Sequence, residues 1–195
     1  MKAFLSELRK SVLLTLLMAV MLCGAYPALV WAGGQALYPN KAYGSLFRDS
    51  TGTVRGSALI GQNFTSAKYF NSRPSAAGTG YDAANSSGTN LGPTSQKLRD
   101  SIKAAAQAYR TANGLPADAV VPADAVTSSA SGLDPHISLT NARLQAVRVA
   151  RERKMPLPAL MGLIEKHTED RDLGVLGEPR INIVILNATL DGIAL

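Results

Sequence analysis

An uncharged, strongly apolar segment near the N-terminus constrains this chain more than any other feature. No residue from Ser11 to Asn40 carries a charge, and the apolar part of this run reads SVLLTLLMAVMLCGAYPALVWA over residues 11–32. An α-helix of that length extends roughly 33 Å, which is enough to cross a hydrocarbon core of about 30 Å. The sequence therefore predicts one transmembrane helix over residues 11–32.

The charges on either side of this segment predict its orientation. Lys2, Arg9 and Lys10 precede it, and the next basic residue is Lys41. Basic residues in short flanks stay on the cytoplasmic side of a membrane. We therefore expect a cytoplasmic segment over residues 1–10 and an extracytoplasmic domain over residues 33–195. The chain would then be a single-pass protein of the cell inner (cytoplasmic) membrane.

A cleaved secretory signal is the alternative interpretation of the same segment. The apolar stretch from Val12 to Leu22 follows a basic start, and residues 30–32 could form a cleavage site. The length of the segment, and Tyr26 and Trp31 at interfacial positions, favour a retained helix. A lipoprotein signal is disfavoured because Leu22, not a small residue, precedes Cys23. Cleavage would give an exported soluble binding or hydrolytic protein.

Composition describes the remainder as one domain held together by packing alone. About 155 residues follow the apolar run, a size that supports one hydrophobic core. The single cysteine, Cys23, lies inside the predicted span, so the exported domain has no thiol for a disulfide. The net charge of the whole chain is +6. A basic cluster over residues 143–154 has helical spacing without interleaved aromatic residues, which indicates a solvated helix face and no nucleic-acid binding.

The pattern of the domain predicts an α+β fold. Residues 44–63 read as a β-hairpin with turn residues 49–52, and residues 71–95 as a long polar loop. Thr94 is a candidate cap for a helix ending near Gly114, and residues 126–136 form another loop. Ser138 is a candidate cap for a second helix ending near Lys154, and Pro158 would begin a short third one. Residues 181–188 are apolar on both faces, which predicts a central strand.

The sequence lacks the motifs of the common catalytic and metal sites. It has no phosphate-binding loop, no aspartyl-phosphate signature of cation pumps, no filter sequence of potassium channels and no nucleophile elbow. His136 and His167 are the two histidines, and their spacing is not that of a zinc site. We therefore predict that this chain is not an enzyme and holds no metal.

Several polar, glycine-rich strings carry a family resemblance. They are GSALIGQNF (56–64), YFNSRPSA (69–76), SSGTNLGP (86–93), SASGLDPHIS (129–138), RVAR (148–151) and GEPRINIV (177–184), followed by Leu186-Asn187 and Leu190-Asp191. With Tyr26-Pro27 in the apolar segment, they closely resemble the KdpC family, the C subunit of the ATP-driven potassium-importing Kdp complex. The resemblance extends in order from the apolar segment to Asp191. Ser87 and Thr89 depart from the family's usual glycine and serine, which puts the local loop geometry in question.

The resemblance implies a role that the residues alone do not show. KdpC proteins look like accessory subunits that assemble with a channel-like potassium-binding subunit, a P-type ATPase subunit and a small single-helix subunit. The family is described as a catalytic chaperone that raises the ATP affinity of the ATPase subunit. Potassium would be the transported ion, and ATP would be bound only in the complex. The resemblance makes Ser86, Ser87, Gly88, Thr89 and Asn90 candidates for nucleotide contact, although the sequence by itself assigns none.

Charge and location suggest where the exported domain acts. We expect it to lie over the outer mouth of the potassium-binding subunit, with loops 69–75, 86–90 and 129–138 as candidate contacts. The candidate residues of an interface or a structural polar network are Arg73, Ser75, Asn90, Asp134 and Arg148. The alternative is that these loops are buried turns, in which Arg73, Asp134 and Arg148 satisfy internal hydrogen bonds.

Overall fold

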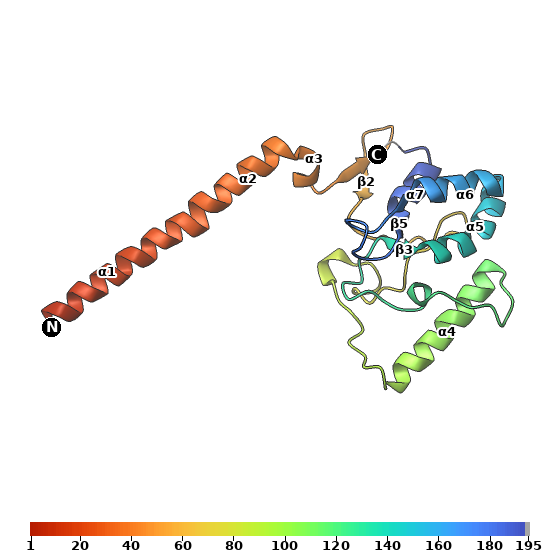
Figure 1. Cartoon of the computed structure of the whole chain (residues 1–195), viewed down its shortest axis with the longest axis horizontal. Coiled ribbons are helices and arrows are strands. Elements are labelled where there is room, and N and C mark those ends of the chain that lie inside the picture. Colours follow the sequence, from red (N-terminus) through yellow and green to blue (C-terminus); the bar gives the residue numbers. More distant parts are fainter. Residues whose placement is uncertain (194–195) are drawn as a thin grey trace. The chain divides into compact units, whose positions relative to one another are not determined.

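The computed structural model describes residues 1–193 and divides the chain into two compact units. The first extends from Met1 to Ser45 and the second begins at Leu46 (Figure 1). Positions 194 and 195, the last two of the predicted exported domain, lie outside the described residues. A helical first unit and a mixed second unit confirm the α+β class with one N-terminal apolar helix.

The first unit is one long helix followed by a short turn of helix. Its segments are α1 (Lys2–Ala19), the π-helical η1 (Val20–Ala25) and α2 (Tyr26–Leu37), with α3 (Pro39–Ala42) after them (Figure 1). The continuous helix over Lys2–Leu37 is long and apolar enough to cross a membrane. None of its residues is buried within the chain. It therefore offers its whole apolar surface to lipid or to other helices.

The π-helical segment ends at Ala25, two residues before Pro27. Proline has no N–H, so Pro27 cannot donate to the carbonyl of Cys23 four residues earlier. A π-turn widens the helix and re-registers its hydrogen bonds at such a position. The helix continues through Pro27, which lies in the first turn of α2.

The second unit begins with the predicted hairpin. Strands β1 (Leu46–Arg48) and β2 (Val54–Ser57) pair antiparallel, with a register shift between Phe47 and Arg48. The carboxylate of Asp49 accepts hydrogen bonds from the backbone N–H groups of Thr51 and Thr53, at 2.9 and 3.0 Å, and so closes the turn. Phe47 points inward and packs against Val184 and Ala188.

The predicted long loop and first helix follow. Residues 71–95 hold one 3-10 turn, η2 (Ala83–Asn85), before α4 (Gln96–Asn113). Ser95 caps α4 by accepting a hydrogen bond from Leu98 N–H at 3.3 Å, so the expectation that Thr94 does so is wrong by one residue. Gly114 ends the helix with φ of +64°, as predicted.

A small antiparallel sheet and three helices form the main core. After η3 (Ala123–Ala125) come β3 (His136–Ser138), α5 (Leu139–Arg153), α6 (Leu157–Lys166), β4 (Thr168–Glu169), β5 (Arg180–Asn182) and α7 (Ile183–Leu190). The strand order is β3-β5-β4, and α5, α6 and α7 gather around this sheet (Figure 1). Ser138 caps α5 as predicted, through a bond from Asn141 N–H. The fully buried core side chains include Phe70, Ala146, Val149, Leu160, Ile164, Ile181, Ile183 and Leu186.

The predicted strand over residues 181–188 is wrong beyond its second residue. β5 ends at Asn182, and Ile183–Leu190 form α7. The side chain of Asn182 accepts hydrogen bonds from the N–H groups of Val184 and Ile185, at 3.1 and 3.2 Å, and thereby starts the helix. A helix buried on all sides has the same apolar run as a buried strand, so periodicity could not separate them. The central position of β5 in its sheet is confirmed.

Candidate functional site

The three polar loops singled out by the sequence meet around Gly132. The hydroxyl of Ser75 donates to the carbonyl of Gly132 at 2.6 Å and accepts from the backbone N–H of Tyr81 at 2.8 Å. Gly132 has φ of +67°, and an added Cβ would lie 2.7 Å from Ala77 N and 2.8 Å from Ser87 O. The loops are therefore packed backbone against backbone at this point. Position 132 has room for the hydrogen of glycine but not for a side chain.

The candidate nucleotide-contacting string, residues 86–90, is tied to the neighbouring loop. The hydroxyl of Ser86 and the N–H of Ser87 both donate to the carbonyl of Ser131, at 2.9 and 3.0 Å. The backbone of Gly88 approaches Ala130 so closely that a Cβ would lie 3.1 Å from its carbonyl oxygen. The positive φ of this segment, 52°, belongs to Asn90. Serine at position 87 therefore needs no positive φ.

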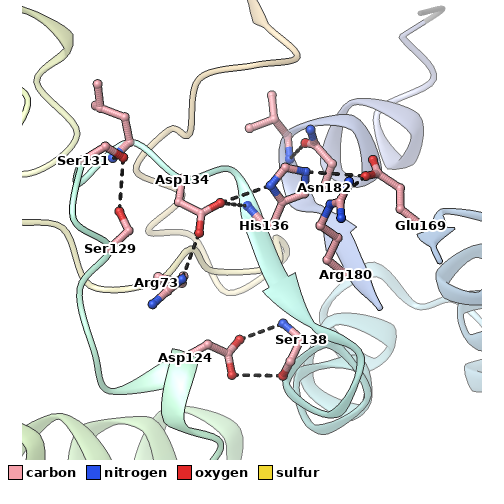
Figure 2. A network of polar contacts seen from close by, with 12 residues as sticks. Arg73, Asp124, Ser129, Ser131, Asp134, His136, Ser138, Glu169, Arg180 and Asn182 are labelled. Carbon is pink, nitrogen blue, oxygen red and sulfur yellow. Dashed lines mark hydrogen bonds and ion pairs between the residues drawn. The ribbon is translucent and has the colours of Figure 1, made fainter. Parts of the chain in front are cut away.

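Arg73 and Asp134 form an ion pair at the centre of a wider polar network. Arg73 Nη1 lies 2.9 Å from Asp134 Oδ2. The other carboxylate oxygen, Oδ1, accepts from the backbone N–H of His136 at 2.9 Å and lies 3.1 Å from its Nδ1 (Figure 2). Beyond the imidazole, Nε2 is 3.8 Å from Glu169 Oε2, which Arg180 Nε approaches at 3.0 Å. Arg180 Nη1 in turn lies 3.4 Å from Asp172.

The surroundings of Asp134 keep its carboxylate ionised. Burial raises the pKa of Asp134, but the hydrogen bonds from His136 and the charge of Arg73 together outweigh it. The resulting pKa lies below the ordinary value of an aspartate. Its contribution to stability is therefore complete above the ordinary aspartate pKa and is lost as the pH falls through the lower, folded-state pKa. The ion pair is thus formed throughout the neutral range.

Arg148 lies in a second network, away from this ion pair. Its side chain belongs to α5 and is 4% exposed. The guanidinium donates to Asn113 Oδ1 (2.9 Å), Tyr69 O (3.0 Å), Asn71 Oδ1 (2.7 Å), Gln145 Oε1 (2.9 Å) and Ala67 O. Burial lowers the pKa of Arg148. The five neutral oxygens stabilise the buried charge by accepting its hydrogen bonds. The structure therefore brings Arg73, Ser75 and Asp134 together through loops 69–75 and 129–138, leaves Asn90 exposed on loop 86–90, and places Arg148 in the interior.

Sequence reasoning missed three polar side chains that hold the loops and helices together: Gln145, Asn187 and Asp124. Gln145 joins α5 to the loop by accepting from Asn71 N at 2.7 Å and donating to its carbonyl at 3.2 Å. Asn187 exchanges two hydrogen bonds with the backbone of Phe70, each 2.9 Å long. Asp124 accepts from the N–H and hydroxyl of Ser138, at 2.8 and 2.9 Å (Figure 2). The available signal was a polar residue in an apolar setting: Gln145 on the apolar face of a predicted helix, and Asn187 in the apolar run predicted as a strand.

Two shallow hollows flank Arg73. One, of about 540 Å³, lies between loop 69–75 and the neighbouring turn; the other, of about 230 Å³, is lined by Asp134, His136, Glu178 and Arg180. The Nε of Arg73 is buried and has no hydrogen-bond partner among residues 1–193. Within the same residues, no group of three or more His, Cys, Asp or Glu side chains is placed to hold a metal ion. The side chain that the two hollows share is therefore that of Arg73, which retains one buried, unpaired donor.

Comparison with known proteins gives one consistent result. The family model described as "K+-transporting ATPase, c chain" matches residues 8–192. A potassium-transporting ATPase KdpC subunit of Nitratidesulfovibrio vulgaris is 50% identical over 97% of this chain and 96% of the relative. The KdpC subunit of Koribacter versatilis is 50% identical over 93% of this chain and 92% of the relative. That of Mycobacterium bovis (strain BCG / Pasteur 1173P2) is 54% identical over 85% and 87%.

Proposed function

The chain belongs to the KdpC family, the c chain of a K+-transporting ATPase, and from this premise we propose that it is a non-catalytic accessory subunit of that pump. The observation that carries the proposal is the family match over residues 8–192, which includes both the apolar helix and the domain. We propose that its partners are a channel-like potassium-binding subunit, a P-type ATPase subunit and a small single-helix subunit. Each of these would supply a part that this chain's sequence lacks.

The topology proposed is one membrane helix with the domain on the extracytoplasmic side of the inner membrane. The continuous apolar helix extends to Leu37, past the candidate cleavage site at residues 30–32, which supports retention. Basic residues at positions 2, 9 and 10 support a cytoplasmic N-terminus. The competing function, an exported soluble protein, requires loss of the segment through Ala32. The mass of the mature chain separates the two.

The ATP-related part of the role is assigned to the complex. The polar groups of Ser86 and Ser87 are engaged with Ser131, which supports a structural role for residues 86–90. We propose that this chain binds no ATP by itself and that it raises the ATP affinity of the ATPase subunit within the complex. Potassium is the transported ion, and no catalytic residue is assigned here.

The proposed function predicts the behaviour of the pump with and without this chain. A tagged copy purified from membranes should bring down the other subunits and potassium-stimulated ATPase activity. In membranes without this chain, that activity should be lost or require a higher ATP concentration for half-saturation. The measurement is ATP hydrolysis against ATP concentration, with added potassium. An unchanged half-saturating concentration would remove the ATP-affinity role, and failure to copurify would remove the subunit role.

We propose that the loop cluster around Arg73, formed by loops 69–75, 86–90 and 129–138, is part of the contact with the potassium-binding subunit. Arg73 lies between two hollows, and 23% of its side-chain surface is exposed, so part of the guanidinium can be reached by another subunit. Asp134 holds the guanidinium in place from one side. A charged group fixed in this way can pair with a partner's carbonyl or carboxylate without further ordering.

Replacing Arg73 tests this contact. Arg73→Gln should reduce association with the complex about tenfold or more, as for other charge-paired interface groups. The measurement is the recovery of complex at a temperature where the variant and the unsubstituted chain are both folded. Near-ultraviolet circular dichroism establishes that temperature. Arg55→Gln is the matched control, because Arg55 also pairs with an aspartate, Asp49, at 2.8 Å but lies on the hairpin. Equal recovery of the two variants would contradict a contact between Arg73 and a partner subunit, and loop 69–75 would then be an internal turn.

A further inference from the structure

The connection between β4 and β5 exposes three large apolar side chains on an ordered turn. Leu173 is 90% exposed, Val175 73% and Leu176 57%. We call residues 171–178 the apolar turn. Monomeric proteins seldom gather several large apolar side chains on one exposed segment without a binding role. The domain core contains none of the three, so their side chains do little for its packing.

The apolar turn is held in one conformation by its own backbone and by ion pairs. Asp172 and Leu176 exchange two backbone hydrogen bonds, each of 2.9 Å, and Gly174 N–H donates to Arg171 O at 3.0 Å. Arg171 pairs with Glu178 at 2.8 Å across the base of the turn. A turn fixed before binding loses little conformational entropy when it meets a partner.

Leu173 has a backbone conformation that does not suit its side chain. Its φ is +55°, in the left-handed region that glycine adopts without strain and a bulky L-residue adopts at a cost. The side chain is nevertheless directed into solvent. Within the domain, glycine would serve this position better than leucine. The leucine is therefore explained by a contact that the domain itself does not contain.

The apolar turn is continuous with the loop cluster around Arg73. Glu178 lines the same hollow as Arg73 and Asp134. The ion-pair network also extends from Asp134 through His136, Glu169 and Arg180 to Asp172 of the turn (Figure 2 shows it as far as Arg180). The two features thus belong to one surface, with a charged part and an apolar part. That composition is typical of a protein interface with a buried anchor and a polar rim.

We propose that the apolar turn inserts Leu173, Val175 and Leu176 into an apolar pocket on another subunit of the potassium pump. The inference rests on the proposed function, which supplies such a subunit. The charges around the turn favour a protein over a lipid surface. Asp170, Asp172 and Glu178 are acidic whereas Arg171 and Arg180 are basic. Arg171 pairs with Glu178 and Arg180 with Asp172, so the segment has no excess of basic residues. Segments that enter anionic membranes carry an excess of basic residues instead. The five residues leave a net charge of −1, so the rim of the partner pocket should be neutral or basic.

Site-specific photocrosslinking in the assembled complex tests the location of the turn. A benzophenone amino acid is placed at position 173 or, as the control, at Val120, which is 87% exposed on a different loop. Illumination of the complex in native membranes should give a protein–protein product from position 173 and little from position 120. Products with lipid alone, or equal products from both positions, would overturn the inference. If the unsubstituted chain fails to copurify with any subunit, the proposed function falls as well.

A substitution that relieves strain separates binding from folding. Leu173→Gly should leave the melting temperature unchanged or raise it, because glycine suits the positive φ. It should also accelerate dissociation of the chain from the immobilised complex about 30-fold, as expected for a buried anchor. Val120→Gly is the control and should leave dissociation unchanged. Equal dissociation of the two variants would contradict a docking role for the turn.

Discussion

Replacement of Arg148 by methionine is expected to lower the free energy of unfolding of the domain by about 3–5 kcal/mol. The guanidinium is buried, and it satisfies side-chain oxygens of Asn71, Asn113 and Gln145 at 2.7 to 2.9 Å. Methionine fills a similar volume but donates nothing, so these acceptors and the backbone carbonyls of residues 67 and 69 would lose their donor. The expected effect is large because the bonds to Asn113 and Gln145 are buried and the other three are partly buried, so water can replace the lost donor only in part.

The measurement is thermal or urea unfolding of the purified full chain in detergent, followed by near-ultraviolet circular dichroism of the domain tyrosines. Arg143→Met is the matched control, because Arg143 is exposed on the same helix, α5. We expect that control to change the unfolding free energy by less than about 0.5 kcal/mol. A small effect of Arg148→Met, equal to that of the control, would mean that Arg148 is dispensable for the fold.

Replacement of Gly132 by alanine is expected to destabilise the domain by about 3 kcal/mol. Part of this cost, about 1–2 kcal/mol, arises because alanine resists the φ of +67°. The rest arises because the new methyl group would meet Ala77 N at 2.7 Å and Ser87 O at 2.8 Å. Both atoms are backbone, so loops 69–77 and 86–90 would have to move apart. The bond from Ser75 to Gly132 O would be strained with them.

Gly114→Ala separates the two contributions to this cost. Gly114 has nearly the same φ, +64°, but no heavy atom lies within 4 Å of its added Cβ. It should therefore show the backbone cost alone, about 1 kcal/mol. The same unfolding measurement serves both variants. Equal losses in the two would show that the loops around Gly132 yield easily, which would contradict the close packing of the cluster.

Part of this fold was predictable because it depends on neighbouring residues. The apolar helix, the hairpin, the cap at Ser138 and the end of α4 at Gly114 each follow from a local pattern or one side chain. The strand predicted over residues 181–188 failed because its apolar run fits a buried helix equally well. The cap at Asn182 decided between them. Strands β3 and β4 were missed because two or three residues carry too little periodicity.

The candidate site divides in the same way. Polar strings in the sequence indicated Arg73, Ser75, Asn90, Asp134 and Arg148, but residue type could not separate the surface pair Arg73–Asp134 from the interior Arg148. The distances along the chain are too long for local pattern to act: Arg148 contacts residues from 67 to 113, and Ser75 contacts Gly132. Chain packing alone brings such groups together.

The sequence by itself determined that this chain carries one apolar helix long enough to span a bilayer, a thiol-free α+β domain and the family strings that the comparisons match. Those features depend on composition, local periodicity and short motifs, which need no knowledge of distant contacts. The tertiary structure decided which polar groups are interior, where three loops close around Gly132, and that Leu173 stands exposed in a strained turn. These follow from burial and backbone geometry, which arise when segments far apart in the chain compete for the same space.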